Sequence, residues 1–508
     1  MYYAELEKNC DEEIYKVIDK HEKEGILIDN FWLASGYSSG EEDNLRYVFN
    51  WNHKRFPEPK KFFDEMNARG INVIPNLKPG ILKCHPYIDL FEKNDVFIKT
   101  PDGKAPYYGR WWGGEGRFFD FTGEAGRNTW KQLLEENILK MGIKTVWNDN
   151  CEMDGVEDRD AQCDFEGKKG TMAELKILHS NLMAYTAKQA LADVYPGERP
   201  YIINRAGYAG IQRYAQVWGG DNLTDWRTVK FNIATILGMG LSGCSNMGCD
   251  IGGFAGPAPE AELLLRWIQN GIFQLRFCMN SANNDNTVTQ PWMYEENLPY
   301  VREAYNLRYR LLPYLYSLMY ESNQNGMPAW RPLFLEFPQD PKCYTDKSLT
   351  FIFGKSILVA NVVEKGATTR SLYLPTGCKW YDINDNLREY EGGHTEDYKK
   401  GVYAKTTITV KAGDLTDIRF ATEGSYESPV ERMTLKLVSK KKGAFWVSVD
   451  GQQLTRYIVR DGWEEAESGW YYNLSDRTIW VKFNKPVKKD FTVTVSTEKF
   501  DLIGMAED

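Results

Sequence analysis

Three aspartates follow short apolar runs that have the pattern of buried strands. Asp149 comes after residues 143–148, Asp221 after residues 215–219, and Asp250 after residues 244–249. An aspartate after a strand often only caps the next helix, but three of them beside Trp, Asn and Gly weaken that interpretation. Two carboxylates flanking a glycosidic bond are the minimum equipment for hydrolysing it, because one attacks the anomeric carbon or activates water and the other protonates the leaving oxygen. These aspartates are therefore candidates for such a pair.

The elements that must position these aspartates alternate between strand and helix patterns. Up to about residue 326, short β-branched or aromatic runs alternate with longer helical patterns, which is typical of βαβ units in a parallel sheet. We expect an α/β fold that closes as a (β/α)8 TIM barrel, where catalytic groups lie at the carboxyl ends of the strands. The expected strands are residues 25–33, 71–77, 143–148, 200–204, 215–219, 244–249 and 274–279, and the main helices are 11–24, 58–69, 129–141, 171–192, 226–239, 259–272 and 300–323.

A barrel of this kind needs eight strands, and the patterns supply seven. Ahead of the first predicted helix only residues 1–6 are available for the missing strand, so we expect the first strand to be short or truncated. After the catalytic barrel of residues 1–326, short alternating segments predict a proximal β-sandwich over residues 327–420. A further all-β stretch predicts an accessory distal β-domain over residues 421–508.

Four motifs, in this order along the chain, resemble glycoside hydrolase family 31. They are WNDNCE at 147–152, WGGDN at 218–222, GCDIGGF at 248–254 and RWIQNGIF at 266–273. The resemblance covers residues 1 to about 415. It implies that the amino-terminal β-sandwich usual in the family is expected to be missing ahead of the barrel. Glycoside hydrolase family 31 includes enzymes similar to α-glucosidases, α-galactosidases and α-N-acetylgalactosaminidases.

The resemblance implies a retaining, exo-acting mechanism by double displacement. Asp149 would attack the anomeric carbon, and Asp221 would give and later take the proton. Arg205 matches an arginine that binds a sugar hydroxyl and steadies the nucleophile, although a structural ion pair is the alternative. The other residues expected to line the pocket are Trp147, Asn148, Trp218 and Asp250, with core packing as the rival role for the Trp218 indole.

Two positions depart from the α-glucosidase pattern of the family. Lys78 stands where an Asp-Pro pair contacts the far side of the terminal sugar, and Cys278 to Asn280 replace an Arg-x-His triplet. Asn280 is smaller than the histidine of the family pattern, so it leaves room for an N-acetyl group at C2 or an axial hydroxyl at C4 of the sugar. We therefore expect an α-N-acetylgalactosaminide or α-galactoside as substrate. Trp112, in an insertion over residues 107–122, is expected to overhang the pocket and stack on the sugar.

Three alternatives to this expectation stay open. The first is an α-glucosidase or α-transglucosylase of the same family, since transfer to another hydroxyl shares the first half-reaction. The second is a catalytically impaired carbohydrate-binding protein. The third is an unrelated barrel isomerase, which would form no glycosyl-enzyme on Asp149.

The composition of the chain limits which classes of binding partner are expected. A net charge of −9 disfavours a nucleic-acid partner. The Lys440 to Lys442 run fits a solvated turn. No run reaches the roughly 18 apolar residues of a membrane span.

Nine cysteines without a C-x-x-C pair suggest reduced thiols in the cytoplasm, although a truncated amino terminus would hide a targeting signal. Five dispersed histidines predict neither a metal nor a cofactor. A carbohydrate is the expected partner, and the oligomeric state is left open.

Overall fold

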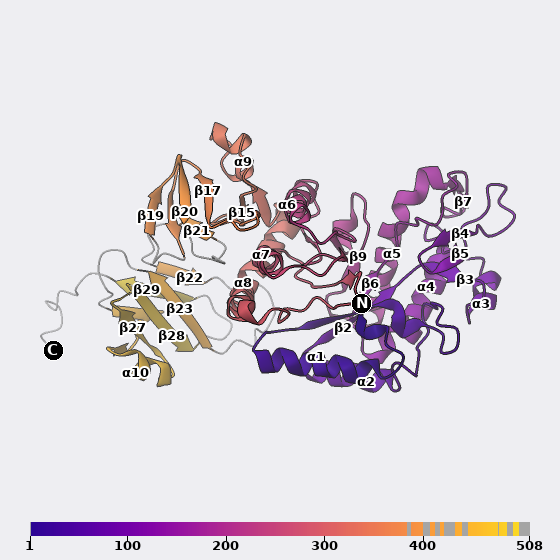
Figure 1. The fold of residues 1–508 in the computed structure, drawn as a ribbon, viewed down its shortest axis with the longest axis horizontal. Coiled ribbons are helices and arrows are strands. Elements are labelled where there is room, and N and C mark those ends of the chain that lie inside the picture. Colours follow the sequence, from indigo (N-terminus) through magenta and orange to yellow (C-terminus); the bar gives the residue numbers. More distant parts are fainter. Residues whose placement is uncertain are drawn as a thin grey trace, which may run out of the picture. The chain divides into compact units, whose positions relative to one another are not determined.

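The computed structural model describes residues 2–383, 388–399, 407–411, 417–420, 432–438, 446–475, 477–484 and 491–496 (Figure 1). The chain divides into two compact units. The first comprises residues 1–376 and 393–408, and the second comprises residues 377–392 and 409–508. The predicted domain boundaries at residues 326 and 420 stay predictions. In the described residues no helix is both long and apolar enough to cross a membrane.

A parallel sheet of six strands forms the centre of the first unit. Its spatial order is β1, β2, β6, β9, β10 and β11, so neighbours in the sheet follow one another along the chain. An isolated parallel bridge between Asp250 and Cys278 extends the series beyond β11. The strands are β1 (Asn30–Leu33), β2 (Asn72–Leu77), β6 (Thr145–Asn148), β9 (Tyr201–Asn204), β10 (Gln216–Trp218) and β11 (Met247–Gly248).

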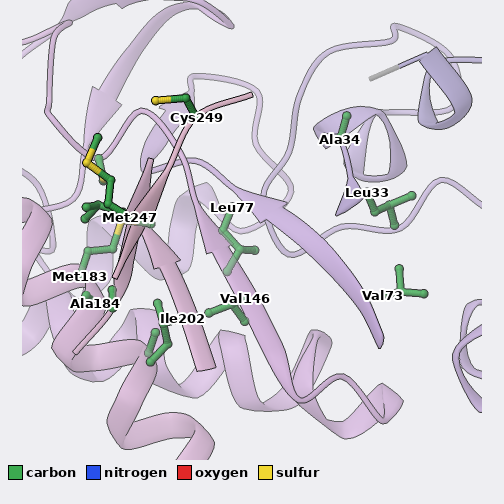
Figure 2. Close-up of a cluster of buried hydrophobic side chains, with 14 of the residues drawn as sticks. Leu33, Ala34, Val73, Leu77, Val146, Met183, Ala184, Ile202, Met247 and Cys249 are labelled. Atoms are coloured by element: carbon green, nitrogen blue, oxygen red, sulfur yellow. The ribbon is translucent and has the colours of Figure 1, made fainter. Parts of the chain in front are cut away.

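Alternation along each strand separates an outer face from an inner face. The outer residues Val73, Val146 and Ile202 belong to the main hydrophobic core, and Figure 2 shows Ile202 near Ala184 of α5 (Met172–Val194). The next residue on each strand faces the other way and joins a separate buried cluster of Ile74, Trp147, Ile203 and Trp218. Since the side-chain period of a strand is two, the residue two positions after Trp147 is Asp149, at the carboxyl end of the same inner face.

The helices follow the predicted pattern and surround the strands (Figure 1). A capping box between Thr171 and Glu174 begins α5, and Asp225 accepts a hydrogen bond from the Thr228 amide at the start of α6. The bounds are α1 (Cys10–Glu24), α2 (Pro59–Ala68), α3 (Ile88–Lys93), α4 (Glu124–Asn137), α6 (Trp226–Leu241), α7 (Ala261–Gly271), α8 (Leu298–Asn325) and α9 (Leu333–Glu336), with 3₁₀ turns η1 (Tyr2–Ala4), η2 (Ser35–Ser38), η3 (Leu139–Met141), η4 (Ile211–Arg213), η5 (Glu295–Asn297) and η6 (Pro341–Tyr344).

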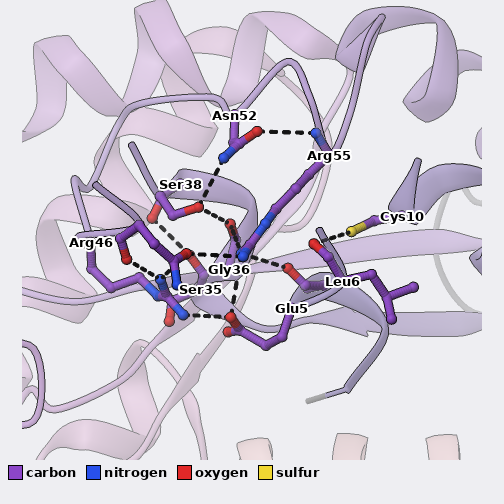
Figure 3. A network of polar contacts seen from close by, with 12 residues as sticks. Glu5, Leu6, Cys10, Ser35, Gly36, Ser38, Arg46, Asn52 and Arg55 are labelled. Atoms are coloured by element: carbon purple, nitrogen blue, oxygen red, sulfur yellow. Dashed lines mark hydrogen bonds and ion pairs between the residues drawn. The ribbon is translucent and has the colours of Figure 1, made fainter. Parts of the chain in front are cut away.

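Residues 2–4 form the 3₁₀ turn η1, where Arg55 donates to the Ala4 carbonyl, which agrees with the expected short or truncated first strand. Arg55 also contacts Glu5 and the Gly36 carbonyl in the network of Figure 3.

The expectation of a regular strand over residues 274–279 is wrong. Residues 274–279 pair with the sheet only at the Cys278 bridge, since Arg308 binds the carbonyls of Gln274 and Leu275. Among the described residues, no strand pairs with β1 on the side that faces this segment.

The first unit also contains several small sheets outside the central parallel sheet. The insertion at residues 107–122 contains a hairpin of β4 (Gly109–Trp111) and β5 (Gly114–Phe118), and β5 also pairs with β3 (Gly80–Leu82). Two short pairs are β7 (Gln162–Cys163) with β8 (Gly170–Thr171) and β12 (Ala255–Gly256) with β13 (Ala282–Asn283). Antiparallel strands follow residue 326, as predicted: β14 (Trp330–Pro332), β15 (Phe351–Phe353), β16 (Ile357–Ala360), β17 (Thr369–Leu374) and β20 (His394–Lys399).

The second unit is all-β apart from α10 (Arg460–Glu465) in its described residues. It has two four-stranded sheets, β22-β29-β24-β25 and β23-β28-β27-β26, around a core of Val447, Trp470 and Val481. The Lys440 to Lys442 run lies outside the described residues. The described strands of this unit are β18 (Lys379–Asp382), β19 (Arg388–Glu391), the end of β21 (Thr407–Lys411), β22 (Asp417–Phe420), β23 (Arg432–Val438), β24 (Trp446–Val449), β25 (Gln452–Gln453), β26 (Arg456–Tyr457), β27 (Gly469–Asn473), β28 (Thr478–Asn484) and β29 (Phe491–Ser496).

Candidate active site

Asp149 lies at the carboxyl end of β6 and is almost completely buried, with 7% of its surface exposed. One carboxylate oxygen accepts a hydrogen bond from Asn76 Nδ2 at 3.0 Å and forms an ion pair with Lys78. The other oxygen accepts from its neighbour's backbone amide, Asn150 N, at 2.8 Å and lies 3.3 Å from Arg205 Nη1. Both oxygens are therefore held in fixed directions before any ligand binds.

The charges around Asp149 decide its protonation. Burial by itself would raise the pKa of this carboxyl group, but the Lys78 ammonium and the Arg205 guanidinium outweigh burial and hold the pKa below its ordinary value. Asp149 is thus ionised at neutral pH, which is the state that a nucleophile needs.

Asp221 follows β10 after two glycines, and its side chain is 48% exposed. Burial of the remaining part and the negative charge of Asp149 raise the pKa of Asp221, while Arg205 and Lys78 oppose the rise. The two aspartates therefore have pKa values displaced in opposite directions. This is the usual signature of one ionised and one proton-carrying member in a catalytic pair.

Arg205 lies between the two carboxylates. Its Nη1 atom is 3.3 Å from Asp149 Oδ1 and 3.7 Å from Asp221 Oδ2, so these two oxygens are at most about 7 Å apart. Retaining glycosidases hold their two carboxyl groups about 5–5.5 Å apart, and inverting ones about 6.5–9.5 Å. The other end of the guanidinium pairs with Glu152 and lies 3.9 Å from Asp154. Arg205 therefore forms a structural ion pair with Glu152 and also contacts Asp149, which is the geometry that both of the alternative roles require.

Lys78 contacts more than Asp149. Its ammonium donates to Asn150 Oδ1 at 2.7 Å and lies 5.0 Å from the centre of the Trp112 ring. Trp112 sits at the turn of the β4–β5 hairpin, is 56% exposed, and also carries Arg46 over its ring at 5.5 Å. An exposed indole above the site fits the predicted sugar-stacking position, and the cation–π contacts hold it there.

Three residues that were expected to line the pocket lie deeper. Trp147 and Trp218 pack edge to face inside the sheet, with ring centres 5.7 Å apart, and form a floor beneath the aspartates. Asn148 is fully buried on the outer face of β6, where it donates to Asn204 Oδ1 at 2.8 Å. Strand alternation turns the Asn148 side chain away from Asp149, so the structure does not bring it together with the other expected site residues.

The remaining predicted residues gather around Asp250. This carboxyl group is fully buried, and Arg276 Nη1 lies 2.8 Å from it. Burial raises the pKa of Asp250 to about 6, against the influence of Arg276. Asn280 approaches Asp250 at 3.5 Å, and Cys278 bridges to Asp250 through the backbone. Burial also raises the pKa of the Cys278 thiol to about 12, so this thiol stays neutral.

Asn76 and Arg276 also contribute to the site, although neither was among the expected site residues. Glu152 contributes as well; it belongs to the motif at residues 147–152 but had been given no role. Asn76 carries a usable signal, since an amide in the buried run of residues 71–77 must find a polar partner. Arg276 carries the same signal within residues 274–279. Its partner, Asp250, lies 26 positions earlier in the chain and could be identified only from the fold.

One group of possible metal ligands lies elsewhere in the described residues. Asp120, Cys163 and His179 are buried and have their ligand atoms within 4.8 Å of one another. Asp120 already accepts hydrogen bonds from Thr122 and from the Asp164 amide, and Cys163 Sγ lies 3.6 Å from His179 Nε2. Hydrogen bonds therefore account for this cluster.

Two family models match most of the chain. Residues 3–318 match the TIM-barrel domain of glycosyl hydrolases family 31, and residues 326–415 match the C-terminal domain of the same family. These matches confirm the expected resemblance and the barrel followed by a further domain.

Curated relatives are similar over about three quarters of the chain. A probable glucan 1,3-alpha-glucosidase of Arabidopsis thaliana is 31% identical over 406 residues, which cover 76% of this chain and 42% of that protein. Alpha-glucosidase 2 of Bacillus thermoamyloliquefaciens is 31% identical over 380 residues, 73% of this chain and 47% of that protein. Human neutral alpha-glucosidase C is 32% identical, with 76% and 42% covered. The chain thus spans less than half the length of these relatives.

Solved structures support the fold. A family 31 dextranase of Flavobacterium johnsoniae, solved with glucose, superposes with a TM-score of 0.85 at 22% identity, covering 97% of this chain and 69% of that one. A glucosidase II alpha subunit superposes with a TM-score of 0.80 at 21% identity, covering 96% and 60%. At such identities the likeness concerns the fold alone.

Proposed function

Because this chain belongs to family 31 of the glycosyl hydrolases, we propose that it is a retaining α-glycosidase that removes a terminal α-linked sugar. Asp149 is the nucleophile and Asp221 the acid/base. The observation that carries this proposal is the placement of Arg205 between the two aspartates, together with their opposite pKa displacements.

The first half-reaction joins the sugar to Asp149. An oxygen of the ionised carboxylate forms a bond to the anomeric carbon while the bond to the leaving oxygen breaks. Asp221 gives its proton to that oxygen, so the aglycone leaves as a neutral alcohol. The product is a β-linked glycosyl-enzyme, and Asp221 is now a carboxylate.

The second half-reaction restores both groups. A water molecule gives its proton to Asp221 and attacks the anomeric carbon from the face that the aglycone left, which returns the sugar with its original α configuration. Asp149 leaves as a carboxylate. Two inversions at one carbon give net retention, and the enzyme ends in its starting protonation state.

The substrate we propose is an α-glucoside. The curated relatives reported above are named as α-glucosidases, and none of those three carries a name that refers to galactose or N-acetylgalactosamine. They therefore favour glucose over the galacto-configured sugar that Lys78 and Asn280 suggested. In addition, Lys78 forms an ion pair with Asp149, and Asn280 approaches Asp250, so both side chains already have partners within the protein.

We also propose a reducing compartment, such as the cytoplasm. Within the described residues no cysteine is joined in a disulfide, and burial raises the pKa of several of the thiols, including Cys151 and Cys249 to about 12. Such thiols are poorly reactive.

A panel of aryl α-glycosides that differ only at C2 and C4 tests the substrate. The glucoside should have the highest kcat/KM. A preference of tenfold or more for the galactoside or the N-acetylgalactosaminide would overturn the choice of glucose and leave the mechanism intact. The β-glucoside is the control, because Asp149 cannot displace its aglycone from the required face.

A further inference from the structure

Glu152 is a third carboxylate beside the two proposed catalytic ones. It follows Asp149 by three positions in the loop after β6, and its side chain is only 20% exposed. Its Oε1 atom forms a close ion pair with Arg205 Nη2. Within the described residues no hydrogen bond from another residue reaches either oxygen of Glu152, and Arg205 is the one cation paired with it. The proposed mechanism gives this largely buried charge no part in the chemistry.

The guanidinium of Arg205 divides its two ends between two groups of carboxylates. Nη2 contacts Glu152 and lies 3.9 Å from Asp154. Nη1 lies 3.3 Å from Asp149 and 3.7 Å from Asp221. Because a guanidinium is planar and rigid, fixing Nη2 also limits where Nη1 can lie. The Asp154 side chain is 67% exposed and therefore screened by water, so Glu152 is the stronger anchor for Nη2.

The proposed reaction moves one negative charge across the site. In the free enzyme Asp149 is ionised and Asp221 carries a proton, whereas in the glycosyl-enzyme Asp149 is a neutral ester and Asp221 is a carboxylate. With Lys78 and Arg205 as cations and Glu152 as a second anion, the charges cancel in both states. Without the charge of Glu152, the cluster would carry one uncompensated positive charge in a partly buried place, where such a charge is costly.

We propose that Glu152 is a positioning residue that remains ionised in both half-reactions and anchors Nη2 of Arg205. Nη1 then pairs mainly with Asp149 in the free enzyme and with Asp221 in the glycosyl-enzyme, where Asp149 no longer carries a charge. Nη1 needs no large movement, since it already lies close to both carboxylates. Glu152 acts through Arg205 and takes no part in bond making or proton transfer. The proposal rests on the roles proposed above for Asp149 and Asp221.

The charge on Glu152 depends mainly on Arg205. Burial raises the pKa of Glu152, and Arg205 opposes that rise. Asp154 and Asp149 also face Glu152, and water screens Asp154. The Cys151 thiol, which faces Arg205 as well, stays neutral because burial raises its pKa to about 12. Arg205 is therefore the contact through which a change at Glu152 reaches the two proposed catalytic carboxylates.

The pH profile of Glu152→Gln tests the proposal. Glutamine keeps the size of the side chain and an oxygen for Arg205, and it removes only the charge. Arg205 is then shared by Asp149 and Asp221 alone, so the pKa of both carboxyl groups should fall. Both limbs of the kcat/KM profile should therefore move to lower pH. The expected shift is about 0.4 to 1.5 pH units, for unit charges roughly 8 Å apart at effective dielectric constants between about 80 and about 20.

Two further variants separate charge from packing. Glu157→Gln makes the same change at an exposed residue of the same loop and should leave both limbs in place. Glu152→Ala removes the anchor as well as the charge, so both limbs should again move down and kcat should fall by about a hundredfold through misplacement of Arg205. Glu152→Gln should keep most of its kcat at its pH optimum. Limbs that stay in place in Glu152→Gln, or an equal shift in Glu157→Gln, would refute the proposal, since a residue needed only for packing changes activity without moving either limb.

Direct titration separates this proposal from the proposed function. If the wild-type chain hydrolyses no aryl α-glycoside, the proposed function fails. The pKa values of Asp149 and Asp221 are measured in either case by NMR of the carboxyl carbons in aspartate-labelled protein, with each signal assigned from its Asn variant. Both values should be lower in Glu152→Gln, or in Glu152→Ala if the first variant does not fold. Unchanged values would show that Glu152 does not act on the two aspartates through Arg205.

Discussion

The ion pair between Lys78 and Asp149 should set the acid limit of activity. In Lys78→Met the side chain keeps similar length but loses its charge, so Asp149 keeps Arg205 and Asn76 as partners and loses its strongest favourable charge. The pKa of Asp149 should therefore rise toward its ordinary value. Since the nucleophile must be ionised, the acid limb of the kcat/KM profile should move to higher pH, while activity above pH 7 changes less.

The magnitude follows from the burial of the pair. Two unit charges about 4 Å apart attract by about 1 kcal/mol in water and about 4 kcal/mol at an effective dielectric constant of 20. The side chains of Lys78 and Asp149 are 11% and 10% exposed, so the larger value is the better guide. If relaxation recovers half of it, about 2 kcal/mol is lost, which corresponds to roughly a 30-fold fall in kcat/KM on the acid side of the limb.

The assay is kcat/KM for an aryl α-glucoside between pH 3.5 and 8. Lys83→Met is the matched control, because Lys83 pairs with Glu115 at the surface and touches neither aspartate. A uniform loss of activity in Lys78→Met, with the acid limb unmoved, would refute the reasoning. It would instead indicate that Lys78 binds the sugar and does not act through the charge of Asp149.

Three further outcomes are expected. Asp221→Ala should reduce kcat/KM far more for aglycones that leave poorly than for activated ones. It should also remove the basic limb, because the raised pKa of Asp221 keeps its proton available until the pH rises through that pKa; a basic limb unchanged in this variant would contradict the assignment. Asn148→Ala should lower the free energy of unfolding, measured by urea denaturation, by about 1–3 kcal/mol, because Asn204 loses a buried hydrogen-bond donor. Its KM, measured by steady-state kinetics, should stay within about twofold of the wild-type value. Arg276→Met should cost about 3–5 kcal/mol of stability by leaving Asp250 buried without its cation, and Asp250→Asn in the same chain should recover part of that loss; no recovery would mean that Arg276 acts through packing.

Local patterns were enough to find the elements and the two aspartates. The helix over residues 171–192 is observed as Met172–Val194, because a capping box and a run of apolar residues specify it within the segment itself. The strands before Asp149 and Asp221 are likewise specified by apolar runs within their own segments. Since parallel strands share one orientation, their carboxyl ends place both aspartates on the same side of the sheet.

Long-range partners could not be predicted in this way. Lys78 was expected to contact sugar, and the structure shows it against Asp149, because the register of β2 against β6 brings residues 71 positions apart together. Arg276 was missed for the same reason. Asn148 was misplaced because a motif names residue types and does not say which face of the strand each occupies.

Covalent trapping on Asp149 tests the central claim most directly. A 5-fluoro-α-glucosyl fluoride, which slows the second half-reaction more than the first, is incubated with the full chain, and the digested protein is analysed by mass spectrometry. We predict one added fluoroglucosyl group on the peptide that contains Asp149, and none in Asp149→Asn. A label on Asp221, or steady turnover of an aryl α-glucoside by Asp149→Asn, would contradict the account.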